Sequence, residues 1–580
     1  MRRQVAAAVA FSVAIAVGTS AMPQGVLADE FEMFAPTFYV ATPAREYAEG
    51  SACADPDFWV DGDWSDGGDL RDGAAPGLAY DSDDDAIQDA VDGATSGSVI
   101  YICAGVYVFA DQVEIDSGMN ITMQGDGIDI TIIDGDETTR IFDADGVGEN
   151  DQGGTLTLVD FSIFDAHTAD ELDNGGAVIA DGLSLVRVQI AGSDGAYNGG
   201  ALYAEGDVSI EDSAFYNNNS SRDGAALYAW NNDTSTTISS STFDGNQASG
   251  YAGAILVNGN LEIHDSEFVE NFGAEYGGAV VNTAGDKEVV ISDSTFTNNL
   301  TDANGGALVM HNLAALTITE SFFTGNLAGS FGGAMNIAAI VSVNIVRSDF
   351  VGNEALGGRV DENGNGGAVD ACDIGRFSSS SSRYIGNYST RDGGAIGLFG
   401  GGCSSPGSIV LTKNLFRDNS AWGDGGALWL SGVLEKMTGN RFIRNEADEL
   451  GGAVFGGSWA DGELSSQRIE RNSFKSNSAG EAGGALWLPG NIESLRRNLF
   501  RANRTEGDGG AVAINGLYWI AIRGNLMFRN QADARGGAFY LQCSYLNRSS
   551  LQRLAGANRL SGNVARDSRR TSRIYQAGIC

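Results

Sequence analysis

The sequence contains little proline, lysine or histidine, with 7 Pro, 4 Lys and 3 His among 580 residues. Few candidates therefore exist for chemistry that depends on Lys or His side chains. So little Pro excludes a proline-rich disordered chain and, despite 81 Gly, also excludes collagen, which needs both residues. The net charge of −41 opposes binding to a phosphate backbone, so we expect no nucleic acid partner.

Long apolar runs are also missing beyond the first residues. Arg2 and Arg3 precede an apolar stretch over 6–18, and Val26-Leu27-Ala28 places small residues where signal peptidase requires them. This pattern predicts a signal peptide over residues 1–28, whereas a membrane anchor would need a longer run. No later stretch reaches 18 apolar residues, so we expect an exported chain without an integral membrane segment.

Charge is unevenly distributed along the chain. Residues 1–400 carry 13 basic and 61 acidic side chains, a net charge of −48. Residues 401–580 carry 22 basic and 15 acidic side chains, a net charge of +7. Within these halves we distinguish an acidic N-terminal segment, residues 29–82, and a basic C-terminal tail, residues 566–580. Such asymmetry concerns solubility and the choice of partner rather than the fold.

Six cysteines suit an oxidising compartment, in which disulfides form and persist. None of them is spaced as Cys-x-x-Cys, so we expect neither a zinc site nor a thioredoxin-like redox motif. Free buried thiols are the alternative to disulfides, and six cysteines allow 15 connectivities. Pairing between neighbours in the sequence would join Cys53 to Cys103, Cys372 to Cys403 and Cys543 to Cys580.

The main feature of the sequence is internal repetition. Two short motifs alternate along the chain, Gly-Gly-Ala and Phe-x-x-Asn. The Asn of each Phe-x-x-Asn lies six positions before the first residue of the next Gly-Gly-Ala, except between Asn353 and Gly366, where the chain has an insertion. Constant corners joined by segments of variable length are typical of the coils of a solenoid. The 14 copies of Gly-Gly-Ala, or close variants, have a mean spacing of about 28 residues and place their Ala at 177, 201, 226, 254, 279, 307, 334, 368, 395, 427, 453, 485, 511 and 538.

The segments between the motifs alternate with the period of a β-strand. The first position after each Ala is apolar, as in Val178 and Leu202, and the third is mostly apolar or small, while the second varies freely. This alternation predicts that the first and third side chains point inward and the second points outward. Another short strand precedes each motif Phe, as over residues 261–268. Helical periodicity is absent, so we expect stacked β-coils.

Stacked coils would place equivalent residues about 4.8 Å apart and so form ladders of identical side chains. The motif Phe would fill the core as offset rings. The motif Asn would bond to the Asn of the neighbouring coils. A further column of small polar residues, from Ser213 to Asn525, would lie beside the Phe and bond in the same way. The Gly pair suits a corner that needs positive φ or close backbone approach.

Over residues 170–565 these repeats resemble those of the chlamydial-type polymorphic outer membrane proteins, within the right-handed parallel β-helix, or pectin-lyase-like, superfamily. Upstream, Ile87-Gln-Asp-Ala-Val91 and Asn120-Ile-Thr-Met123 resemble the opening of many extracellular β-helix proteins, where a short helix covers the open end. The resemblance implies an all-β fold, a single-stranded right-handed parallel β-helix with an N-terminal capping helix. The cap and first coils would occupy 83–170, and the repeats 171–565.

The superfamily includes polysaccharide lyases and hydrolases, so an enzyme is one alternative. Hydrolases need paired carboxylates, and lyases typically use Ca²⁺ with an Arg or Lys base. Carboxylates are so numerous here that chance pairs on neighbouring coils are expected. Because no clustered set of Asp, His, Arg and Lys interrupts the repeat, we assign no catalytic residue. We interpret His264 and His311 as ordinary polar-face residues.

One segment carries a weak calcium signature. Asp361, Asn363 and Asn365 match the first half of an Asp-x-Asn-x-Asn-Gly loop, whose alternate oxygens can chelate Ca²⁺. The twelfth position is Cys372 rather than the bidentate Glu. A plain polar loop is therefore the alternative, and we expect no other metal or cofactor.

The outward second position after Ala predicts a candidate binding face. Exposed rings beside cations would stack on sugars or bind an acidic partner. The alternative is an aromatic ladder that stabilises the sheet or is covered by loops. The rings toward the C-terminus are Trp429, Phe455, Trp487 and Tyr540, and the cations that recur just after the motif Phe include Arg444, Lys475 and Arg501.

These features together favour a non-catalytic, adhesin-like protein that presents loops and an outward aromatic and basic face to a cell-surface protein or a polysaccharide. We expect it to be secreted or held at the cell surface in association with the outer membrane. An extracellular polysaccharide lyase or glycoside hydrolase of the pectin-lyase-like fold is the alternative. A third interpretation is a purely architectural spacer.

Overall fold

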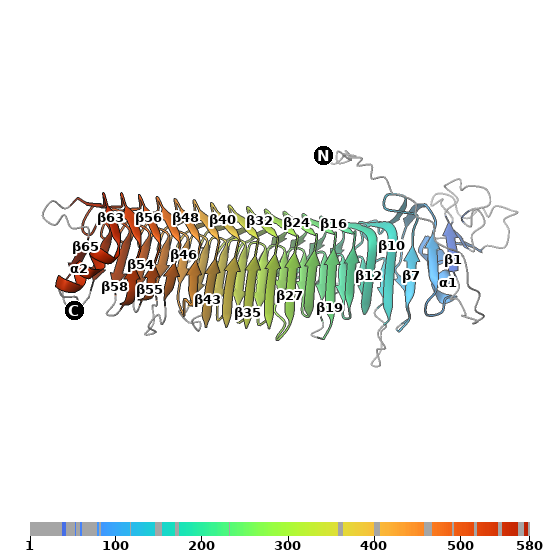
Figure 1. Cartoon of the computed structure of the whole chain (residues 1–580). Coiled ribbons are helices and arrows are strands. Elements are labelled where there is room, and N and C mark those ends of the chain that lie inside the picture. Colours follow the sequence, from blue (N-terminus) through green and yellow to red (C-terminus); the bar gives the residue numbers. More distant parts are fainter. Residues whose placement is uncertain are drawn as a thin grey trace, which may run out of the picture. The chain divides into compact units, whose positions relative to one another are not determined.

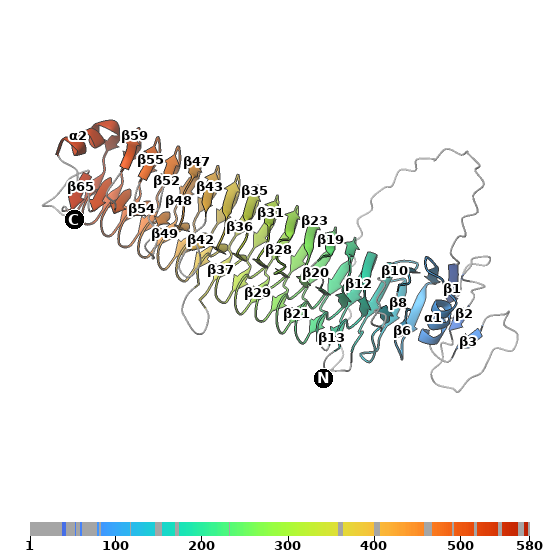
Figure 2. The same ribbon diagram turned by 90° about the horizontal axis from the view of Figure 1, so that it is seen from below.

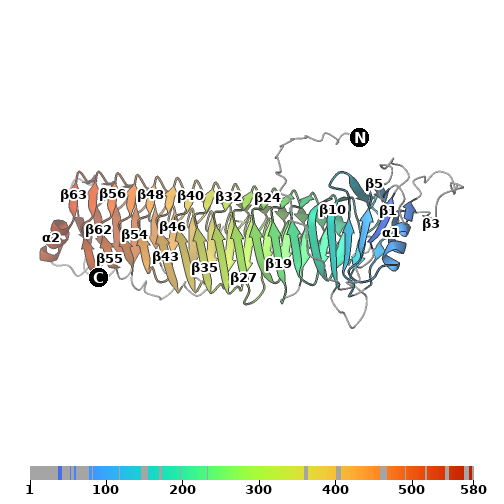
Figure 3. The same ribbon diagram turned by 45° about the vertical axis from the view of Figure 1, so that its right-hand side comes forward.

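The predicted fold class is confirmed: the chain is a right-handed parallel β-helix of about 15 turns (Figures 1 and 3). No helix in the described part of the chain is long and apolar enough to cross a membrane. The predicted signal peptide lies outside the described residues. The computed structural model describes residues 37–41, 53, 58–60, 78–80, 83–116, 118–144, 154–168, 173–195, 197–230, 233–357, 364–399, 407–457, 467–489, 492–515, 519–542, 548–566 and 574–577.

One coil shows how the strands are distributed over three parallel sheets, here called sheets A, B and C (Figure 2). The first strand of the coil lies in sheet B, the next two in sheet A and the last in sheet C. Each strand pairs in parallel with its equivalent in the next coil, so that Phe268 lies opposite Phe296. The strands are β22 (Ile255–Val257), β23 (Asn260–His264), β24 (Glu267–Val269) and β25 (Phe272–Gly273).

The motif Phe forms the predicted ladder inside the coils. From Phe215 to Phe500 the rings are fully buried and nearly parallel, and Tyr384 takes the place of Phe in one coil. Neighbouring ring centroids lie 4.7–4.9 Å apart with interplanar angles of 2–9°. Since this separation is close to the spacing of paired strands, the backbone ladder sets the stacking distance. Met527 continues the column in the following coil.

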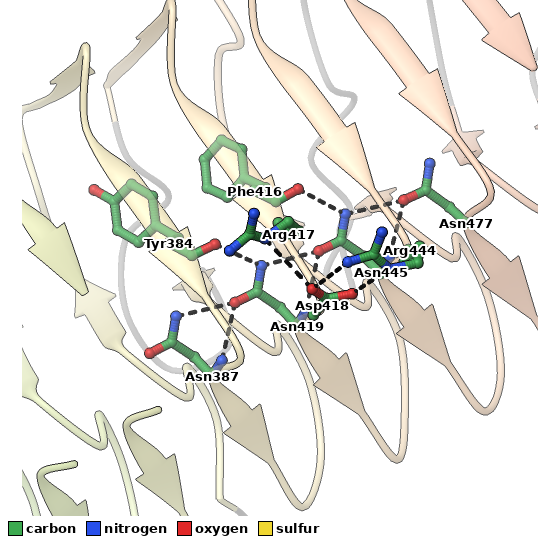
Figure 4. A network of polar contacts seen from close by, with 9 residues as sticks. All are labelled: Tyr384, Asn387, Phe416, Arg417, Asp418, Asn419, Arg444, Asn445 and Asn477. Atoms are coloured by element: carbon green, nitrogen blue, oxygen red, sulfur yellow. Dashed lines mark hydrogen bonds and ion pairs between the residues drawn. The ribbon is translucent and has the colours of Figure 1, made fainter. Parts of the chain in front are cut away.

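The motif Asn forms a second ladder at the corner between sheets A and C (Figure 4). The Nδ2 of Asn445 donates to Oδ1 of Asn477 at 2.9 Å and to the carbonyl oxygen of Phe416 at 3.1 Å. Its Oδ1 accepts from the side-chain and backbone N–H groups of Asn419 at 2.9 and 3.2 Å. Every polar atom of the buried amide therefore has a partner, as the repeat predicts.

The small polar column lies at the bend between the two strands of sheet A. The Oγ of Ser266 donates to the carbonyl oxygen of His264 at 2.7 Å and accepts the backbone N–H of Ser241 at 3.2 Å. From Asn414 onward an amide replaces the hydroxyl. The ladder thus continues unbroken although its chemistry changes halfway along the stack.

The N-terminal end is covered by helix α1 (Asp83–Asp92), which buries Ile87 and Val91 in the core. The predicted capping helix is therefore present. Upstream of it, strand β1 (Thr37–Ala41) pairs with β4 (Val99–Ile102). Strands β2 (Phe58–Val60) and β3 (Leu78–Tyr80) extend the same sheet. Part of the acidic segment 29–82 thus belongs to sheet A.

A second helix, α2 (Arg548–Ala557), lies at the C-terminal end and was not predicted. Its Leu554 is buried, and the Leu554 carbonyl oxygen accepts a 2.8 Å hydrogen bond from Nδ2 of Asn558. Beyond it, β65 (Ile574–Ala577) pairs with β62 (Phe539–Gln542) in sheet B. A strand of the last coil therefore lies within the basic tail.

Candidate functional site

The predicted aromatic residues form a column on the outer side of sheet B. Trp429 stacks between Phe399 and Phe455, with ring centroids 4.3 and 5.7 Å away, and Phe455 stacks on Trp487 at 4.7 Å. The predicted exposure of this column is wrong, because Trp429 is only 1% exposed, Phe455 5% and Tyr540 7%. Trp487 is half-buried. Rings as covered as Trp429, Phe455 and Tyr540 cannot stack on a sugar, so these three rings stabilise the sheet.

The segment that precedes each Gly-Gly lies over the outer side of sheet B. Tyr251 and Tyr276 form a parallel bridge with each other and pack against buried outer residues of sheet B such as Leu256. The first Gly of each pair makes this approach possible. Gly451 has a φ of 65°, and a Cβ on it would press against the carbonyl oxygen of Val454. The strand period reveals which way a side chain points but not what lies above it.

The predicted cations lie on another sheet from the rings. Lys475 ends β52 (Ser473–Lys475) and Arg501 ends β56 (Leu499–Arg501), both in sheet A, and Arg444 follows β48 (Arg441–Ile443) at the corner. The structure thus does not bring the two predicted groups together. Among the described residues, the cation that contacts the aromatic column is Arg535, 4.9 Å from the ring centroid of Tyr540. Arg535 lies in the segment before the Gly pair, three residues before Ala538. The sequence shows this position, but the strand alternation alone does not place it beside the rings.

The outer face of sheet A changes its charge along the stack. In the strands and bends of residues 208–324 its ionic side chains are nearly all acidic. Those residues are Glu211, Asp212, Asp244, Glu262, Asp265, Glu267, Glu270, Glu288, Asp293 and Glu320. Where this acidic region ends, ion pairs link successive coils, between Glu320 and Arg347 at 2.6 Å and between Asp349 and Arg383 at 2.9 Å.

Over residues 376–561 the same face is mostly basic, and we call this region the basic face. Its four acidic residues are Asp418, Glu435, Glu470 and Glu493. Its 16 cations are Arg376, Arg383, Lys413, Arg417, Lys436, Arg441, Arg444, Arg468, Arg471, Lys475, Arg496, Arg497, Arg501, Arg523, Arg529 and Arg559. Besides β48, β52 and β56, the basic face contains β39 (Arg376–Ser380), β40 (Arg383–Ile385), β43 (Ser408–Thr412), β44 (Leu415–Arg417), β47 (Lys436–Thr438), β51 (Arg468–Glu470), β55 (Ile492–Arg496), β59 (Trp519–Arg523), β60 (Leu526–Phe528) and β63 (Arg559–Ser561).

Only some of these cations are neutralised by neighbours. Arg444 binds Asp418 of the preceding coil through two bonds of 2.6 and 2.7 Å (Figure 4). Arg441, Lys475 and Arg559 have no carboxylate within 4 Å in the described part of the chain. Exposed ion pairs contribute little to stability, about 0–1 kcal/mol each, so the pairs on this face have little effect on folding.

Carboxylates with strongly raised pKa values are buried at corners. Asp424 is 3% exposed, and its burial, with Asp392 one coil away, raises the pKa of its carboxyl to about 8. Its Oδ1 accepts the backbone N–H of Leu450 at 3.0 Å, and Oδ1 of Asp392 accepts that of Asp424 at 2.8 Å. Both carboxylates therefore hold the backbone of the next coil and do not face solvent, where a substrate would bind.

The histidines take part in similar local contacts. Nε2 of His311 lies 2.9 Å from Oδ1 of Asn336, whose Nδ2 donates to Asp370 at 2.8 Å. Burial raises the pKa of Asp370 to about 8, and its second oxygen has no hydrogen-bond partner among the described residues. Nδ1 of His264 lies 2.8 Å from Oγ of Ser292. These contacts fit the interpretation of both histidines as ordinary polar residues.

The predicted calcium ligands can be located only in part. Asp361 and Asn363 lie outside the described residues, and Oδ1 of Asn365 accepts the backbone N–H of Asp392 at 3.3 Å. Among the residues that the structure describes, no group of three His, Cys, Asp or Glu could hold a metal ion. The calcium loop therefore stays a prediction.

One predicted disulfide is confirmed, between Cys53 and Cys103. It ties the segment before α1 to the end of β4. Cys372 is also disulfide-bonded, to a partner outside the described residues. The remaining predicted disulfide residues, Cys403, Cys543 and Cys580, lie outside the described residues as well.

A cavity of about 320 Å³ lies at the C-terminal end of the basic face, a feature that the sequence analysis missed. It is open to solvent and formed by the outward residues of β60 and β63 and the corners after them. Its lining combines an aromatic ring, two guanidinium groups and a hydroxyl. The lining residues are Leu526, Phe528, Arg529, Arg559, Ser561 and Gly562.

Comparisons with known proteins add only distant structural likenesses. No family model and no curated protein sequence matches the chain. A mannuronic acid specific polysaccharide family 6 lyase from human gut microbiota is similar over 83% of this chain and 89% of its own, with 12% identity and a TM-score of 0.37. The A-module of a mannuronan C-5 epimerase of Azotobacter vinelandii covers 63% of this chain and 96% of its own, with 13% identity and a TM-score of 0.39. PfbA, a surface adhesin of Streptococcus pneumoniae, covers 76% of this chain and 87% of its own, with 11% identity and a TM-score of 0.27.

Proposed function

We propose that the protein is a non-catalytic, adhesin-like binding protein that holds an acidic polysaccharide along the basic face of sheet A. The observation that carries this proposal is the charge of that face, 16 cations against four acids in a chain with a net charge of −41. A face so rich in positive charge, on a chain whose net charge is strongly negative, needs a physical explanation. An anionic partner supplies it, because the field of the face attracts and orients that partner.

The geometry of the face suits an extended polymer rather than a compact anion. Successive coils repeat at about 4.8 Å, so cations recur at short, regular intervals along the stack. Arg441 and Lys475 stand on successive coils of the same sheet. A flexible chain that bears a carboxylate on each sugar can meet several of these charges at once, and such contacts reinforce one another.

A polysaccharide hydrolase would need paired carboxylates that converge on a bound sugar. The carboxylates with raised pKa values, such as Asp424 and Asp370, are buried and bonded to neighbouring coils. These contacts favour binding without cleavage. A binding experiment that also records product formation separates the two functions.

We further propose that the chain is exported, is held at or released from the cell surface, and is related to the polymorphic outer membrane proteins. The Gly-Gly-Ala and Phe-x-x-Asn motifs, and the two ladders they form, support the relationship. The disulfide between Cys53 and Cys103 supports an oxidising compartment.

Binding of polyuronates and neutral polysaccharides to the purified chain at 50 and 500 mM salt tests the proposal. We expect binding of the acidic polymers alone, weakened at least tenfold by salt and by the double variant Arg441→Gln/Lys475→Gln. The matched control, Glu262→Gln/Glu267→Gln on the acidic half of the sheet, should leave binding intact. Equal binding of neutral polymers would contradict the proposal, as would polymer cleavage with turnover. Preference for DNA or polyglutamate would assign the face to another anion.

A further inference from the structure

The cavity at the end of the basic face arises from a change in side-chain size at the last coil. Phe528 belongs to an outward column of sheet A that passes through Arg417, Ile443, Lys475 and Arg501 in the preceding coils. In the next coil the residue opposite Phe528 is Ser561. The column thus passes from long side chains to a short hydroxyl, and the space above this hydroxyl stays open.

The ring of Phe528 consequently has two different sides. Toward the preceding coil, the guanidinium carbon of Arg501 lies 5.7 Å from the ring centroid. Toward the following coil, the ring borders the cavity, and Ser561 is the residue that pairs with Phe528 in that coil. An aromatic ring with one side open to a concave polar site is the usual platform for the apolar face of a sugar.

Two guanidinium groups stand beside this ring. Neither Arg529 nor Arg559 has a carboxylate within 4 Å among the described residues. Gly562 occupies the position below Arg529 in the next coil, and a Cβ there would lie 3.8 Å from Cγ of Arg529. Both residues line the cavity, and the missing side chain of Gly562 leaves the space beside the Arg529 side chain open. A carboxylate that enters it can accept bidentate hydrogen bonds from Arg.

We propose that this cavity binds a single uronate residue, the end of the acidic polysaccharide that the basic face holds. The sugar ring lies on Phe528, its carboxylate binds Arg529 and Arg559, and the Ser561 hydroxyl bonds a sugar hydroxyl. The volume of about 320 Å³ is at the lower limit of the usual range for small-molecule sites, roughly 300–1,000 Å³, which suits one sugar residue. The inference rests on the proposed function and adds a defined end to the bound chain.

The test measures binding of a uronate monosaccharide and trisaccharide to the full chain by calorimetry and by saturation-transfer NMR. We expect Phe528→Ala and Arg559→Gln each to weaken trisaccharide binding at least tenfold, and Ser561→Ala about threefold. Phe322→Ala is the matched control, because Phe322 is 49% exposed on the acidic half of the same sheet. It should change nothing. Thermal unfolding of each variant checks that its fold is intact.

The outcomes separate this inference from the proposed function. If long polyuronates bind and Arg441→Gln/Lys475→Gln weakens them, while Phe528→Ala leaves trisaccharide affinity unchanged, the cavity proposal is wrong and the face proposal stands. If no acidic glycan of any length binds, both are wrong. A neutral trisaccharide that binds as tightly as the uronate would refute the role of the two Arg residues.

Discussion

Nδ2 of Asn445 donates a 2.9 Å hydrogen bond to Oδ1 of Asn477, its equivalent one coil further along the chain. The same amide also bonds the carbonyl oxygen of Phe416 and accepts two bonds from Asn419. Four bonds therefore meet at a side chain that is fully buried. Their energetic importance follows from what remains when the amide is removed, since a buried donor or acceptor without a partner costs about 1–3 kcal/mol.

Asn445→Leu should accordingly lower the free energy of unfolding by about 3 kcal/mol, because it leaves several of these groups unpaired and buried. Urea denaturation followed by circular dichroism measures the change. Asn219→Ala is the control, since Asn219 is exposed in strand β17 (Asn219–Ser220). A loss for Asn445→Leu no larger than that for the control would contradict the role assigned to the ladder.

Trp429→Ala should act on stability. A buried aromatic ring stacked between two others leaves a large cavity when truncated, at a cost of about 3–5 kcal/mol. Trp422→Ala is the matched control because Trp422 is 60% exposed, and its effect on unfolding should stay below about 0.5 kcal/mol. Polysaccharide binding by folded Trp429→Ala at low temperature should equal that of the wild type. A selective loss of binding would restore the aromatic column as a binding face.

The buried carboxyl of Asp370 makes stability depend on pH. Its pKa is raised to about 8 in the folded protein, against 3.8 ordinarily, so the folded state holds this proton more tightly. The stabilisation is complete below about pH 4 and is lost as the pH rises through 8. Asp370→Asn removes this dependence and should be more stable than the wild type at pH 9, by about 2 kcal/mol or more. Denaturation of both proteins at pH 6 and pH 9 measures the difference, and an equal gap at the two values would count against the buried charge.

Gly451→Ala should destabilise the corner that covers the aromatic column. Gly451 has a φ of 65°, and the new Cβ would press on the backbone of Val454. Together these effects cost about 2–3 kcal/mol. Gly285→Ala is the control, because nothing lies within 4 Å of a Cβ at that position. It should be neutral or stabilise by up to about 1 kcal/mol. Thermal unfolding that ranks the two variants in the opposite order would refute this account of the corner.

The parts of the fold that the sequence predicts are those that depend on equivalent residues in neighbouring coils. The Phe and Asn ladders follow directly from the repeat, because stacking at a fixed separation brings identical side chains together. The failure at Trp429 has another origin, since its covering segment comes from the corner of the coil, which the strand period does not describe. Helix α2 was not predicted because it has no equivalent in the other coils, so the repeat carries no information about it.

The candidate site was predictable in its charge and not in its shape. The excess of cations after residue 400 and the recurrence of Lys475 and Arg501 were visible in the sequence. Their gathering on sheet A, apart from the rings, depends on how the coil divides among three sheets. The cavity depends on a single pair of residues, Phe528 and Ser561, that become neighbours only when their register is known.

The direction of the amide ladder has a consequence for the two ends of the stack of coils. Each Asn in the ladder donates toward the next coil, from Asn218 to Asn246 at one end and from Asn530 to Asn563 at the other. A newly completed coil therefore presents unpaired donors that only its successor can satisfy. The two ends of a stack of coils are thus chemically unlike, because its C-terminal side offers amide N–H groups and its N-terminal side offers amide oxygens.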